Sequence, residues 1–396
     1  MSRAAPRAAD ARVLIVGGGG TGGALAHDLT LRGIQVVLVE RGEFTSGTTG
    51  RHHGLLHSGA RYAVNDRESA VECIEENRIL RRIAPGSFEE NDGLFVAITD
   101  EDMAYYPSFL EGCAASGIDT EVLTPEEALA REPGLNPGLK AAVRVPDATM
   151  DAMRMPLRFF ATAQHHGAEL LNYVEVTGLL RHDGTVTGAA VRDLVRGEDL
   201  EIHADLVVNA TGPWSEKVAT MAGVDVPIRP SPGVMLAVRG RLCNMVINRL
   251  HASGDGDIVV PQRALSVVGT SSWVVQDPDD LGVPEDHVAR MIEEGSVLLP
   301  AVRRAPFRAA WSAARPLIGS RDQADSGREL SRTFKAIDHA ETDDLEGFVT
   351  LTGGKATTLR GMAELCGDLV ARKLGVEVPC LTRETELLPH TAAFAA

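Results

Sequence analysis

The sequence predicts a mixed α/β (α+β) fold, in which a Rossmann-like nucleotide-binding domain carries an inserted, mostly antiparallel β-sheet domain. Three observations lead to this prediction. The chain opens with a strand, a glycine-rich turn, a helix and a second strand, which is the pattern of a βαβ unit. A buried strand returns in mid-chain at Asp205–Ala210, and a glycine-led helix follows at Ala356–Leu374. Strand patterns dominate much of the remainder.

The opening unit is defined by two apolar runs. Arg12–Val16 and Gln35–Glu40 have the short apolar character of buried parallel strands. Gly22–Arg32 is the expected helix between them, and Gly33 stands where a helix-ending glycine belongs. Together they predict one complete βαβ unit.

Two further helices are expected before the strand-rich region. Asp66–Ile83 has helical spacing and ends just before Pro85. A second helix begins at Thr124, because threonine caps a helix and Pro125 suits its first turn. The acids Glu126-Glu127 then lie near the positive end of the helix dipole.

Strands dominate after Leu170. Leu170–Arg181 and Thr185–Val195 flank an Asp-Gly turn and predict a hairpin, which Asp199–His203 extends as a meander. The later expected elements are strands between Ile228 and Thr270 and a helix over Pro284–Leu299.

These elements predict two discontinuous domains. We expect residues 12-85, 147-226 and 345-380 to form the nucleotide-binding domain, because they contain the βαβ unit, the returning strand and the last helix. We expect residues 86-146 and 227-344 to form the inserted substrate-binding domain.

The overall charge argues against nucleic acid as a partner. Asp and Glu number 55 against 39 Lys and Arg, a net charge of −16, whereas nucleic-acid binding depends on neutralising phosphates. No apolar run approaches the roughly 20 residues that span a bilayer, and residues 1–11 lack an apolar signal core. We therefore expect a cytoplasmic protein, with peripheral contact at the inner face of the cell membrane as the other possibility.

The five cysteines are scattered along the chain without a CxxC pair. Their odd number and the expected compartment favour reduced thiols, so we expect neither a metal site nor an iron–sulfur site.

The glycine-rich turn has the spacing of a dinucleotide-binding motif. Gly17, Gly19 and Gly22 match GxGxxG between the first strand and the first helix. The glycines allow a tight turn, close approach of the backbone to a pyrophosphate and close packing of the helix, whose N-terminus attracts the anion. Glu40 ends the next strand, near the usual offset of about 20 residues for an acid that binds ribose hydroxyls.

A carboxylate at position 40 would repel a 2′-phosphate, so the motif predicts FAD or NAD rather than NADP. The alternative is a glycine-rich turn in an unrelated α/β protein. Because there is a single motif of this kind, we do not expect a separate NAD domain.

Four separated motifs carry a resemblance to a known family. They are Thr48-Thr49-Gly50-Arg51-His52-His53-Gly54-Leu55-Leu56-His57-Ser58-Gly59-Ala60-Arg61-Tyr62, Val208-Asn209-Ala210-Thr211-Gly212-Pro213-Trp214, Ala314-Arg315-Pro316-Leu317 and Gly353-Gly354-Lys355. In this order they resemble the FAD-dependent glycerol-3-phosphate dehydrogenases, above all the large subunit of the anaerobic type. These enzymes belong to the D-amino-acid-oxidase-like flavoprotein superfamily. The resemblance covers roughly residues 12 to 380 and implies FAD as the cofactor.

The resemblance implies roles for individual positions. The implied cofactor-binding residues are Gly17, Gly19, Gly22, Glu40, Arg41, Thr48, Thr49, His57, Val176, Ala210, Gly212, Gly354, Lys355, Thr357 and Thr358. The implied substrate-binding residues are Arg61, Tyr62, Arg315 and Lys355, and the implied catalytic residues are His57, Arg315 and Lys355.

The distribution of charge supports an anion site independently. Acidic residues are absent from three basic segments, residues 44–65, 295–321 and 348–362. Such segments can create a local positive field in an acidic chain, and arginine suits phosphate because its planar fork donates two parallel hydrogen bonds. We expect Arg61 and Arg315 to bind the anion, and we expect Arg303, Arg304 and Arg308 to be solvated surface residues.

The histidines allow more than one interpretation. His57 is the first choice for a catalytic base beside the flavin, because imidazole accepts a proton near neutral pH. His52 and His53 could bind a metal, but no carboxylate or thiol lies near them in sequence. His251 and His339 are further possible bases, although such residues are more often ordinary loop histidines. Of the aromatic residues, Trp214 and Trp311 are expected to be packing residues.

The resemblance implies oxidation of sn-glycerol 3-phosphate to dihydroxyacetone phosphate. Hydride would pass to flavin N5, and electrons would then leave to a quinone, a partner subunit or oxygen. Two other hypotheses stay open. One is an FAD-dependent 2-hydroxy-acid (L-2-hydroxyglutarate-like) or amino-acid oxidase or dehydrogenase of the same superfamily. The other is a flavin-binding subunit of a larger complex that catalyses no reaction itself.

The sequence departs from the family pattern near the expected site. His52 stands in place of Asn, Leu359 in place of Tyr, and Ala313-Ala314 in place of Gly-Val. The family's C-terminal cysteine-bearing module is not part of the sequence. The absence of this module leaves the route by which electrons leave open. The substitutions near the site leave the exact substrate open among phosphorylated and carboxylated alcohols.

Overall fold

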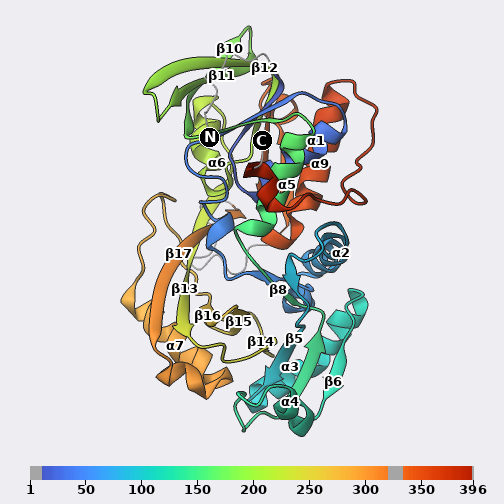
Figure 1. Cartoon of the computed structure of the whole chain (residues 1–396), viewed down its shortest axis with the longest axis vertical. Coiled ribbons are helices and arrows are strands. Elements are labelled where there is room, and N and C mark those ends of the chain that lie inside the picture. Colours follow the sequence, from blue (N-terminus) through green and yellow to red (C-terminus); the bar gives the residue numbers. More distant parts are fainter. Residues whose placement is uncertain (1–10, 320–332, 395–396) are drawn as a thin grey trace.

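The computed structural model describes residues 11–319 and 333–394, and its elements form two sheet-based halves stacked along the long axis of the molecule (Figure 1). Each half combines stretches that lie far apart in the sequence. In the view of Figure 1, the half that contains β12 is at the top and the half that contains α7 is at the bottom.

The upper half is built on a mixed sheet of eight strands. Its centre is parallel, because β1 pairs in parallel with β2 on one side and with β12 on the other. β12 also pairs in parallel with β19 and antiparallel with β11. The strands are β1 (Ala11–Val16), β2 (Val36–Glu40), β9 (Glu169–Asn172), β10 (Val174–His182), β11 (Thr185–Asp193), β12 (Glu198–Asn209), β18 (Phe334–Asp338) and β19 (Phe348–Gly353).

The central strands are apolar throughout because both of their faces are buried. Val13 and Ile15 of β1 enter the core that contains residues of α1, α5 and α9, whereas Leu14 and Val16 enter the core that contains residues of α6. In Figure 1, α1, α5 and α9 lie together beside the sheet. The bounds of these helices are α1 (Gly20–Leu31), α5 (Arg154–His165), α6 (Ser215–Met221) and α9 (Leu359–Lys373).

The lower half is built on a second sheet of eight strands, in the order β17-β13-β16-β15-β14-β5-β7-β6. Its neighbours are antiparallel except for the pair β14 and β5. The strands are β5 (Gly93–Ala97), β6 (Glu121–Leu123), β7 (Ala141–Val145), β13 (Ile228–Arg239), β14 (Val246–Arg249), β15 (Ile258–Gln262), β16 (Leu265–Gly269) and β17 (Phe307–Ile318). The helices are α3 (Asp100–Ala115), α4 (Pro125–Arg131) and α7 (Glu285–Leu298).

A small third sheet and one long helix complete the fold. The sheet has the strand order β3-β8-β4, and its strands are β3 (Leu55–Leu56), β4 (Phe88–Glu89) and β8 (Ala148–Met150). The helix α2 (Arg67–Ile83) is capped by Asp66, whose side chain accepts a hydrogen bond from the backbone of Ser69. A short helix α8 (His339–Thr342) precedes β19.

The structure confirms the predicted mixed fold and refines its elements. The expected strand Leu170–Arg181 is interrupted at Tyr173, which has a φ of 57°. β9 therefore forms a separate strand that pairs in parallel with β2, and β10 begins the hairpin with β11. The two expected strands Asp199–His203 and Asp205–Ala210 form one continuous strand, β12. β18 falls within the 227-344 range, yet it pairs with β19 in the upper sheet.

Candidate active site

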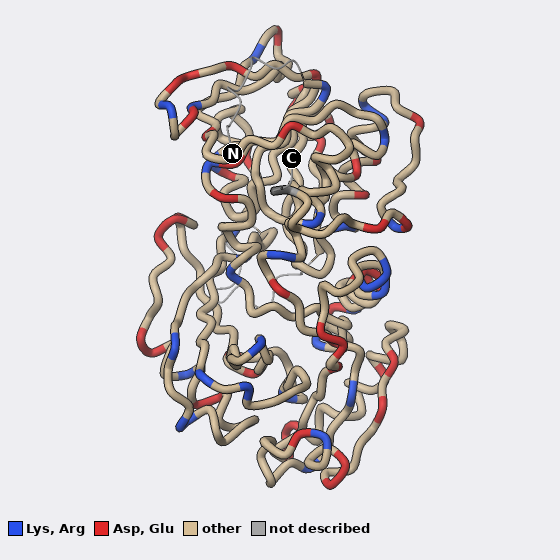
Figure 2. Tube along the Cα trace, viewed as in Figure 1, with Lys and Arg blue, Asp and Glu red and all other residues tan. Residues whose placement is uncertain are grey.

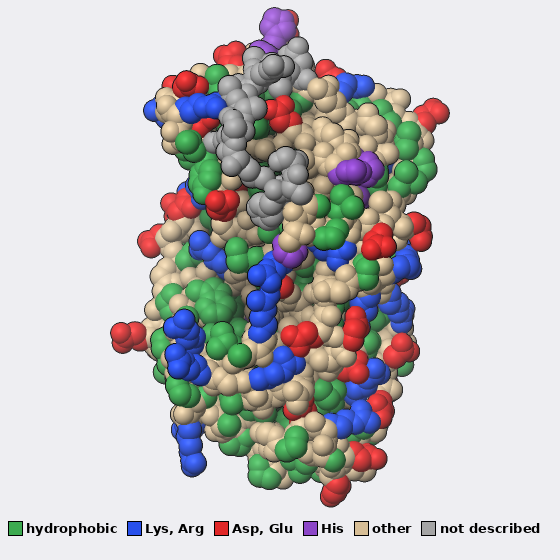
Figure 3. Space-filling model, in the orientation of Figure 1, with side chains coloured by type: hydrophobic (Ala, Val, Ile, Leu, Met, Phe, Trp, Pro, Cys, Tyr) green, Lys and Arg blue, Asp and Glu red, His purple; other side chains and the backbone are tan. Residues whose placement is uncertain are grey.

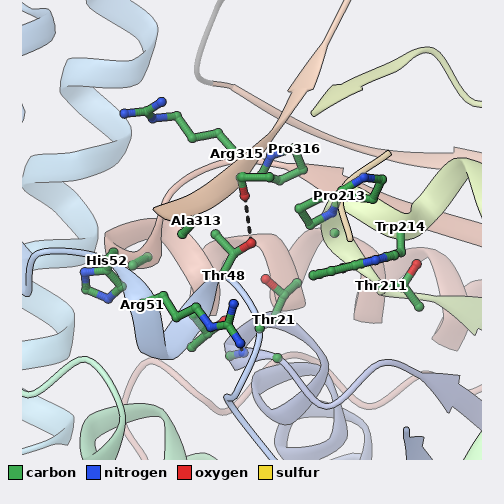
Figure 4. A pocket seen from close by; sticks show the side chains of 18 of the residues that line it. Thr21, Thr48, Arg51, His52, Thr211, Pro213, Trp214, Ala313, Arg315 and Pro316 are labelled. Atoms are coloured by element: carbon green, nitrogen blue, oxygen red, sulfur yellow. Dashed lines mark hydrogen bonds between the residues drawn. The ribbon is translucent and has the colours of Figure 1, made fainter. Parts of the chain in front are cut away.

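A large cavity has walls from both halves of the molecule. Its volume is about 1700 Å³, and its walls include residues of the βαβ unit, of the 44–65 segment and of β17. Figure 4 shows part of it, with Thr48 hydrogen-bonded to the backbone oxygen of Ala314 on β17 at 2.7 Å. The acid-free segments predicted from the sequence therefore meet at one place.

The glycine-rich turn forms one end of the cavity in a way that only glycine allows. Gly17 has a φ of +113°, and a Cβ at this position would lie 2.7 Å from the backbone oxygen of Ala210. A Cβ on Gly22 would lie 2.0 Å from the oxygen of Gly17. Gly19 is the N-cap of α1 and has no capping side chain, so the open helix end faces the cavity as an anion site.

Two polar side chains organise this end. The carboxylate of Glu40, at the end of β2, accepts hydrogen bonds from the backbone N–H groups of Gly18 and Gly42, both at 2.7 Å. The hydroxyl of Thr49 accepts a hydrogen bond from the backbone of Gly20 at 3.0 Å. Glu40 is thereby fixed at the cavity wall, where the sequence motif requires an acid beside the ribose.

Further predicted cofactor residues line the same cavity from other elements. They are Arg41 after β2, Val176 on β10, Ala210 and Gly212 after β12, and Gly354 and Lys355 after β19. The wall thus combines a tight glycine turn, an open helix end, an acid at a strand end and space for a long molecule. These features fit the adenine, ribose and diphosphate parts of a dinucleotide such as FAD.

Another part of the cavity wall combines the cations Arg61 and Lys355 with the Tyr62 ring. Arg61 pairs with the buried carboxylate of Asp257 at 2.6 Å. The ammonium group of Lys355 lies 3.3 Å from Glu72 and 5.2 Å from the centre of the Tyr62 ring. All three cavity-lining residues, Arg61, Tyr62 and Lys355, were predicted from the sequence to bind the substrate.

Arg315 also lines the cavity, from β17. Its guanidinium group donates to the hydroxyl of Thr270 and to the backbone oxygens of Ser231, Pro232 and Ser271. These contacts hold the side chain at the junction of β13, β17 and the segment after β16. Figure 4 shows the extended Arg315 side chain near Ala313.

His57 is held by its backbone and presents its ring to the cavity. Its N–H donates to the hydroxyl of Thr357 at 3.0 Å, and its carbonyl accepts from Asn77 at 3.1 Å. Its ring centre lies 5.6 Å from that of Tyr62 and 5.9 Å from that of His53.

The surroundings of His57 disfavour a positive charge. Burial, assisted by the nearby charges of Arg61 and Lys355, lowers the pKa of His57 to about 3. The imidazole is therefore neutral at physiological pH and has a lone pair available for a proton.

Two residues predicted to bind the cofactor, Thr357 and Thr358, do not line the cavity themselves. Thr357 and Thr358 are fully buried, and Thr357 holds the backbone of His57 while Thr358 accepts a hydrogen bond from the backbone N–H of Lys355 at 3.1 Å. They position two residues of the cavity wall from beneath it.

The other histidines fall into different environments. His339 is buried, with one ring nitrogen 2.7 Å from Asp343 and the other 2.9 Å from the hydroxyl of Thr350, which is a structural arrangement. His251 lies 3.3 Å from Asp257 and thus adjoins the Arg61 pair. In the described parts of the chain, no group of three His, Cys, Asp or Glu side chains is arranged to hold a metal ion.

Three arginines were expected to be solvated surface residues, and the structure agrees. Arg303, Arg304 and Arg308 are exposed. Basic and acidic residues are interspersed along both halves of the trace and on the face drawn in space-filling form (Figures 2 and 3).

No helix within residues 11–319 and 333–394 is both long and apolar enough to cross a membrane.

Sequence reasoning missed several residues of the site. Asp257 and Glu72 pair with Arg61 and Lys355, and Asp279 contacts three residues at the nucleotide end. No local motif marks these acids, because each is far in sequence from its partner. The only signal for these acids in the sequence is that their charge is opposite to that of the predicted cations, and it can be used only once the segments that fold together are known.

Comparison with known proteins agrees with this geometry. Residues 12–369 match the model of the family described as FAD dependent oxidoreductase. The chain belongs to this family. Its cofactor is therefore FAD, which decides between the FAD and NAD left open by the glycine motif.

Individual relatives narrow the resemblance. The oxidoreductase is 44% identical over 377 residues to a subunit of the anaerobic glycerol-3-phosphate dehydrogenase of Escherichia coli (strain K12), covering 95% of this chain and 69% of that protein. It is 44% identical over 397 residues to a subunit of the anaerobic glycerol-3-phosphate dehydrogenase of Haloferax volcanii, covering 96% and 67% of the two chains. The solved glycerol-3-phosphate dehydrogenase of Bacillus halodurans, complexed with FAD, has a TM-score of 0.73 at 24% identity, covering 96% of this chain and 68% of that chain.

Proposed function

We propose that this oxidoreductase converts sn-glycerol 3-phosphate to dihydroxyacetone phosphate. The observation that carries the proposal is one cavity whose wall includes the glycine turn, the cations Arg61, Arg315 and Lys355, and a neutral imidazole. The identity of 44% to dehydrogenases named for this substrate supports it.

The cations would hold the anionic end of the substrate. Arg61 and Arg315 offer planar guanidinium groups, which suit phosphate oxygens, and Lys355 adds a compact charge close to the Tyr62 ring. Because Asp257 offsets the charge of Arg61, that arginine would contribute directed hydrogen bonds more than net charge. The pocket would therefore select a phosphorylated alcohol over glycerol itself.

His57 would remove the proton of the reacting hydroxyl. Bound FAD supplies a hydride acceptor at its N5 atom. The imidazole is neutral before the substrate binds, which is the form that a base needs, but its lowered pKa makes it a weak base in the empty site. A phosphate dianion bound near Arg61 and Lys355 would offset the charges that oppose protonation, and so would strengthen the base when it is needed.

The segment after β19 would complete the site. Gly353 and Gly354 have φ values of +87° and +73°, and they turn the chain so that Lys355 and Ala356 line the cavity. The helical turn that begins at Ala356 leads into α9, and its amides would favour negative charge on a reduced flavin.

The electrons must then leave to an acceptor. We propose a partner subunit or quinone as that acceptor, since the E. coli relative is named as one subunit of the anaerobic dehydrogenase. Contact with the inner face of the membrane would accompany this route. Oxygen is the alternative acceptor, and comparing flavin reoxidation by oxygen with reoxidation by quinone analogues separates the two.

An anaerobic screen tests the proposed substrate. Purified protein with bound FAD is mixed, without oxygen, with glycerol 3-phosphate, other phosphorylated polyols, 2-hydroxy acids and amino acids, and the flavin absorbance is followed. Rapid bleaching by glycerol 3-phosphate alone is the expected result. Bleaching by a 2-hydroxy acid or an amino acid instead would assign the chain to the other enzymatic class. Bleaching by none of them would indicate a non-catalytic flavin-binding subunit.

A further inference from the structure

A loop of the lower half reaches across the nucleotide end of the cavity. It comprises residues 270–284, between β16 and α7, and we call it the 270–284 loop. Its start is held to β13, because the backbone N–H of Trp273 donates to Pro232 and that of Val275 donates to Pro230. Its end is held to β17, because Ser312 donates to the backbone oxygen of Gly282 at 2.6 Å. The middle of the loop projects beyond these anchors.

The middle of the loop carries two acids that meet cations of the upper half. Asp279 accepts from Arg41 at 2.6 Å, from the indole N–H of Trp214 at 2.8 Å and from Lys217 at 2.7 Å. Asp277 accepts from Lys217 at 2.8 Å and from the backbone of Asp279 at 2.9 Å. Five hydrogen bonds therefore converge on two neighbouring carboxylates.

These contacts lie at the cavity rather than on a remote surface. Arg41, Trp214, Lys217 and Asp279 all line it. The guanidinium group of Arg41 is also stacked over the Trp214 ring, with its carbon 5.0 Å from the ring centre. Further loop residues complete this part of the wall, namely Pro278, Leu281, Gly282 and Val283.

The same part of the cavity is the end where the glycine turn and Glu40 fit a diphosphate and a ribose. Arg41 directly follows Glu40 in the sequence, and Trp214 follows the Ala210–Gly212 turn. The 270–284 loop therefore forms part of the wall around the end of the cavity where a diphosphate and a ribose fit.

We propose that Asp277 and Asp279 act as a clasp that retains FAD, by tying the 270–284 loop to Arg41, Trp214 and Lys217 across the nucleotide end of the cavity. Asp279 is then a positioning residue for cofactor binding, supplied by the substrate-binding half. Trp214, which the sequence suggested as a packing residue, is one of the groups that the clasp holds. This inference rests on FAD binding, which family membership shows, and not on the substrate proposed above.

The strength of the clasp must depend on salt. The side chains of Arg41, Lys217 and Asp279 are each 43–44% exposed, so each ion pair alone contributes little. Ions screen such exposed charges over distances of about 10 Å at 0.1 M salt. Asp279, however, accepts hydrogen bonds from several donors and is not limited to one ion pair. Desolvation raises the pKa of Asp279, but the bonds from Arg41, Lys217 and Trp214 outweigh it and lower this pKa to about 2.

The rate of FAD release tests the proposal without any substrate. The holoenzyme is diluted into flavin-free buffer, and the rise in fluorescence of released FAD is followed at about 50 mM and about 500 mM NaCl. In the double variant Asp277→Asn/Asp279→Asn, release should be about tenfold faster than in the wild type at low salt. High salt should accelerate release from the wild type but change the double variant little. Lys217→Gln, which removes two of the ion pairs from the opposite side, should show a smaller acceleration in the same direction.

A matched control is available on the upper sheet. Asp199 forms an exposed ion pair with Arg192 at 3.2 Å, and neither residue lines the cavity. Asp199→Asn should release FAD at the wild-type rate. The clasp would be refuted if the double variant and Lys217→Gln both released FAD within twofold of the wild-type rate. It would also be refuted if salt had an equal effect on the wild type and the double variant. Bleaching by glycerol 3-phosphate is measured separately, so failure of one proposal leaves the other intact.

Discussion

Arg61 donates through a single guanidinium nitrogen to both carboxylate oxygens of Asp257, at 2.6 and 2.8 Å. Asp257 is almost completely buried and also accepts the backbone N–H of Gly254 at 2.7 Å. A residue expected to bind the substrate is therefore fixed by an acid 196 positions away in the sequence. This pair orients Arg61 toward the cavity and balances its charge.

Replacing Asp257 should destabilise the fold. Asp257→Ala leaves Arg61 as an uncompensated, mostly buried charge, so we expect a loss of about 3 kcal/mol in the free energy of unfolding. Urea denaturation measures it. The double variant Asp257→Ala/Arg61→Leu should lose less than the single variant, because no unpaired charge remains. Equal losses in both would show that the pair does not compensate charge.

Arg315→Ala should raise the KM for glycerol 3-phosphate. One charged hydrogen bond contributes about 1.5–3 kcal/mol, which corresponds to roughly 10- to 150-fold in KM. Steady-state kinetics with an artificial acceptor provide the measurement. Arg308→Ala is the matched control, because Arg308 is on the same strand, β17, but is exposed. Unchanged kinetics in Arg315→Ala would remove this residue from the substrate site.

His57→Gln should slow the reaction without loss of the flavin. Removal of a general base costs about 10²- to 10⁴-fold in rate, so flavin reduction in stopped-flow experiments should slow by that factor. The flavin absorbance per protein should stay at the wild-type value. His182→Gln is a suitable control, because the His182 side chain is 81% exposed on β10. A wild-type reduction rate in His57→Gln would assign the base to another residue.

Gly22→Ala should yield protein without FAD. The new Cβ would lie 2.0 Å from the backbone oxygen of Gly17, so α1 must move away from the turn that holds the diphosphate. Absorbance at flavin wavelengths after purification measures occupancy. Gly178→Ala provides the comparison, because a Cβ there meets no atom within 4 Å. A yellow Gly22→Ala protein would contradict the role assigned to the turn.

His27 should make the protein sensitive to acid. It is fully buried beside Phe159, and burial, together with the charge of His166, lowers its pKa to about 3. The unfolded chain binds a proton near pH 6.5 whereas the folded chain does not. His27 therefore costs no stability above about pH 6.5. Below that pH its titration lowers the free energy of unfolding by about 1.4 kcal/mol per pH unit, until the folded pKa is reached.

The variant His27→Leu should lose part of that dependence. Its free energy of unfolding, measured by urea denaturation at pH 7 and pH 5, should fall by about 2 kcal/mol less between the two values than that of the wild type. His182→Leu should behave like the wild type, since an exposed histidine titrates alike in both states. The same pH dependence in His27→Leu and in the wild type would show that His27 does not control it.

The sequence by itself determined the parts of this protein that depend on short-range pattern. The glycine spacing at positions 17 to 22, the acid at position 40 and the apolar runs around them specify a βαβ unit, because each step of that motif is a local steric or electrostatic requirement. The four motifs also pointed to the residues around the cavity, from Thr48 to Lys355. The acid-free segments indicated an anion site, since charge can be counted without coordinates.

Tertiary structure alone decided how those residues are paired. The bonds from Arg61 to Asp257, from Lys355 to Glu72 and from Arg41 to Asp279 each join segments far apart in the chain. The burial that keeps His57 neutral, and the use of Thr357 and Thr358 beneath the site, also follow from packing. The physical reason is that hydrogen bonds, desolvation and charge pairing depend on distances of a few ångströms, and only the folded chain sets those distances.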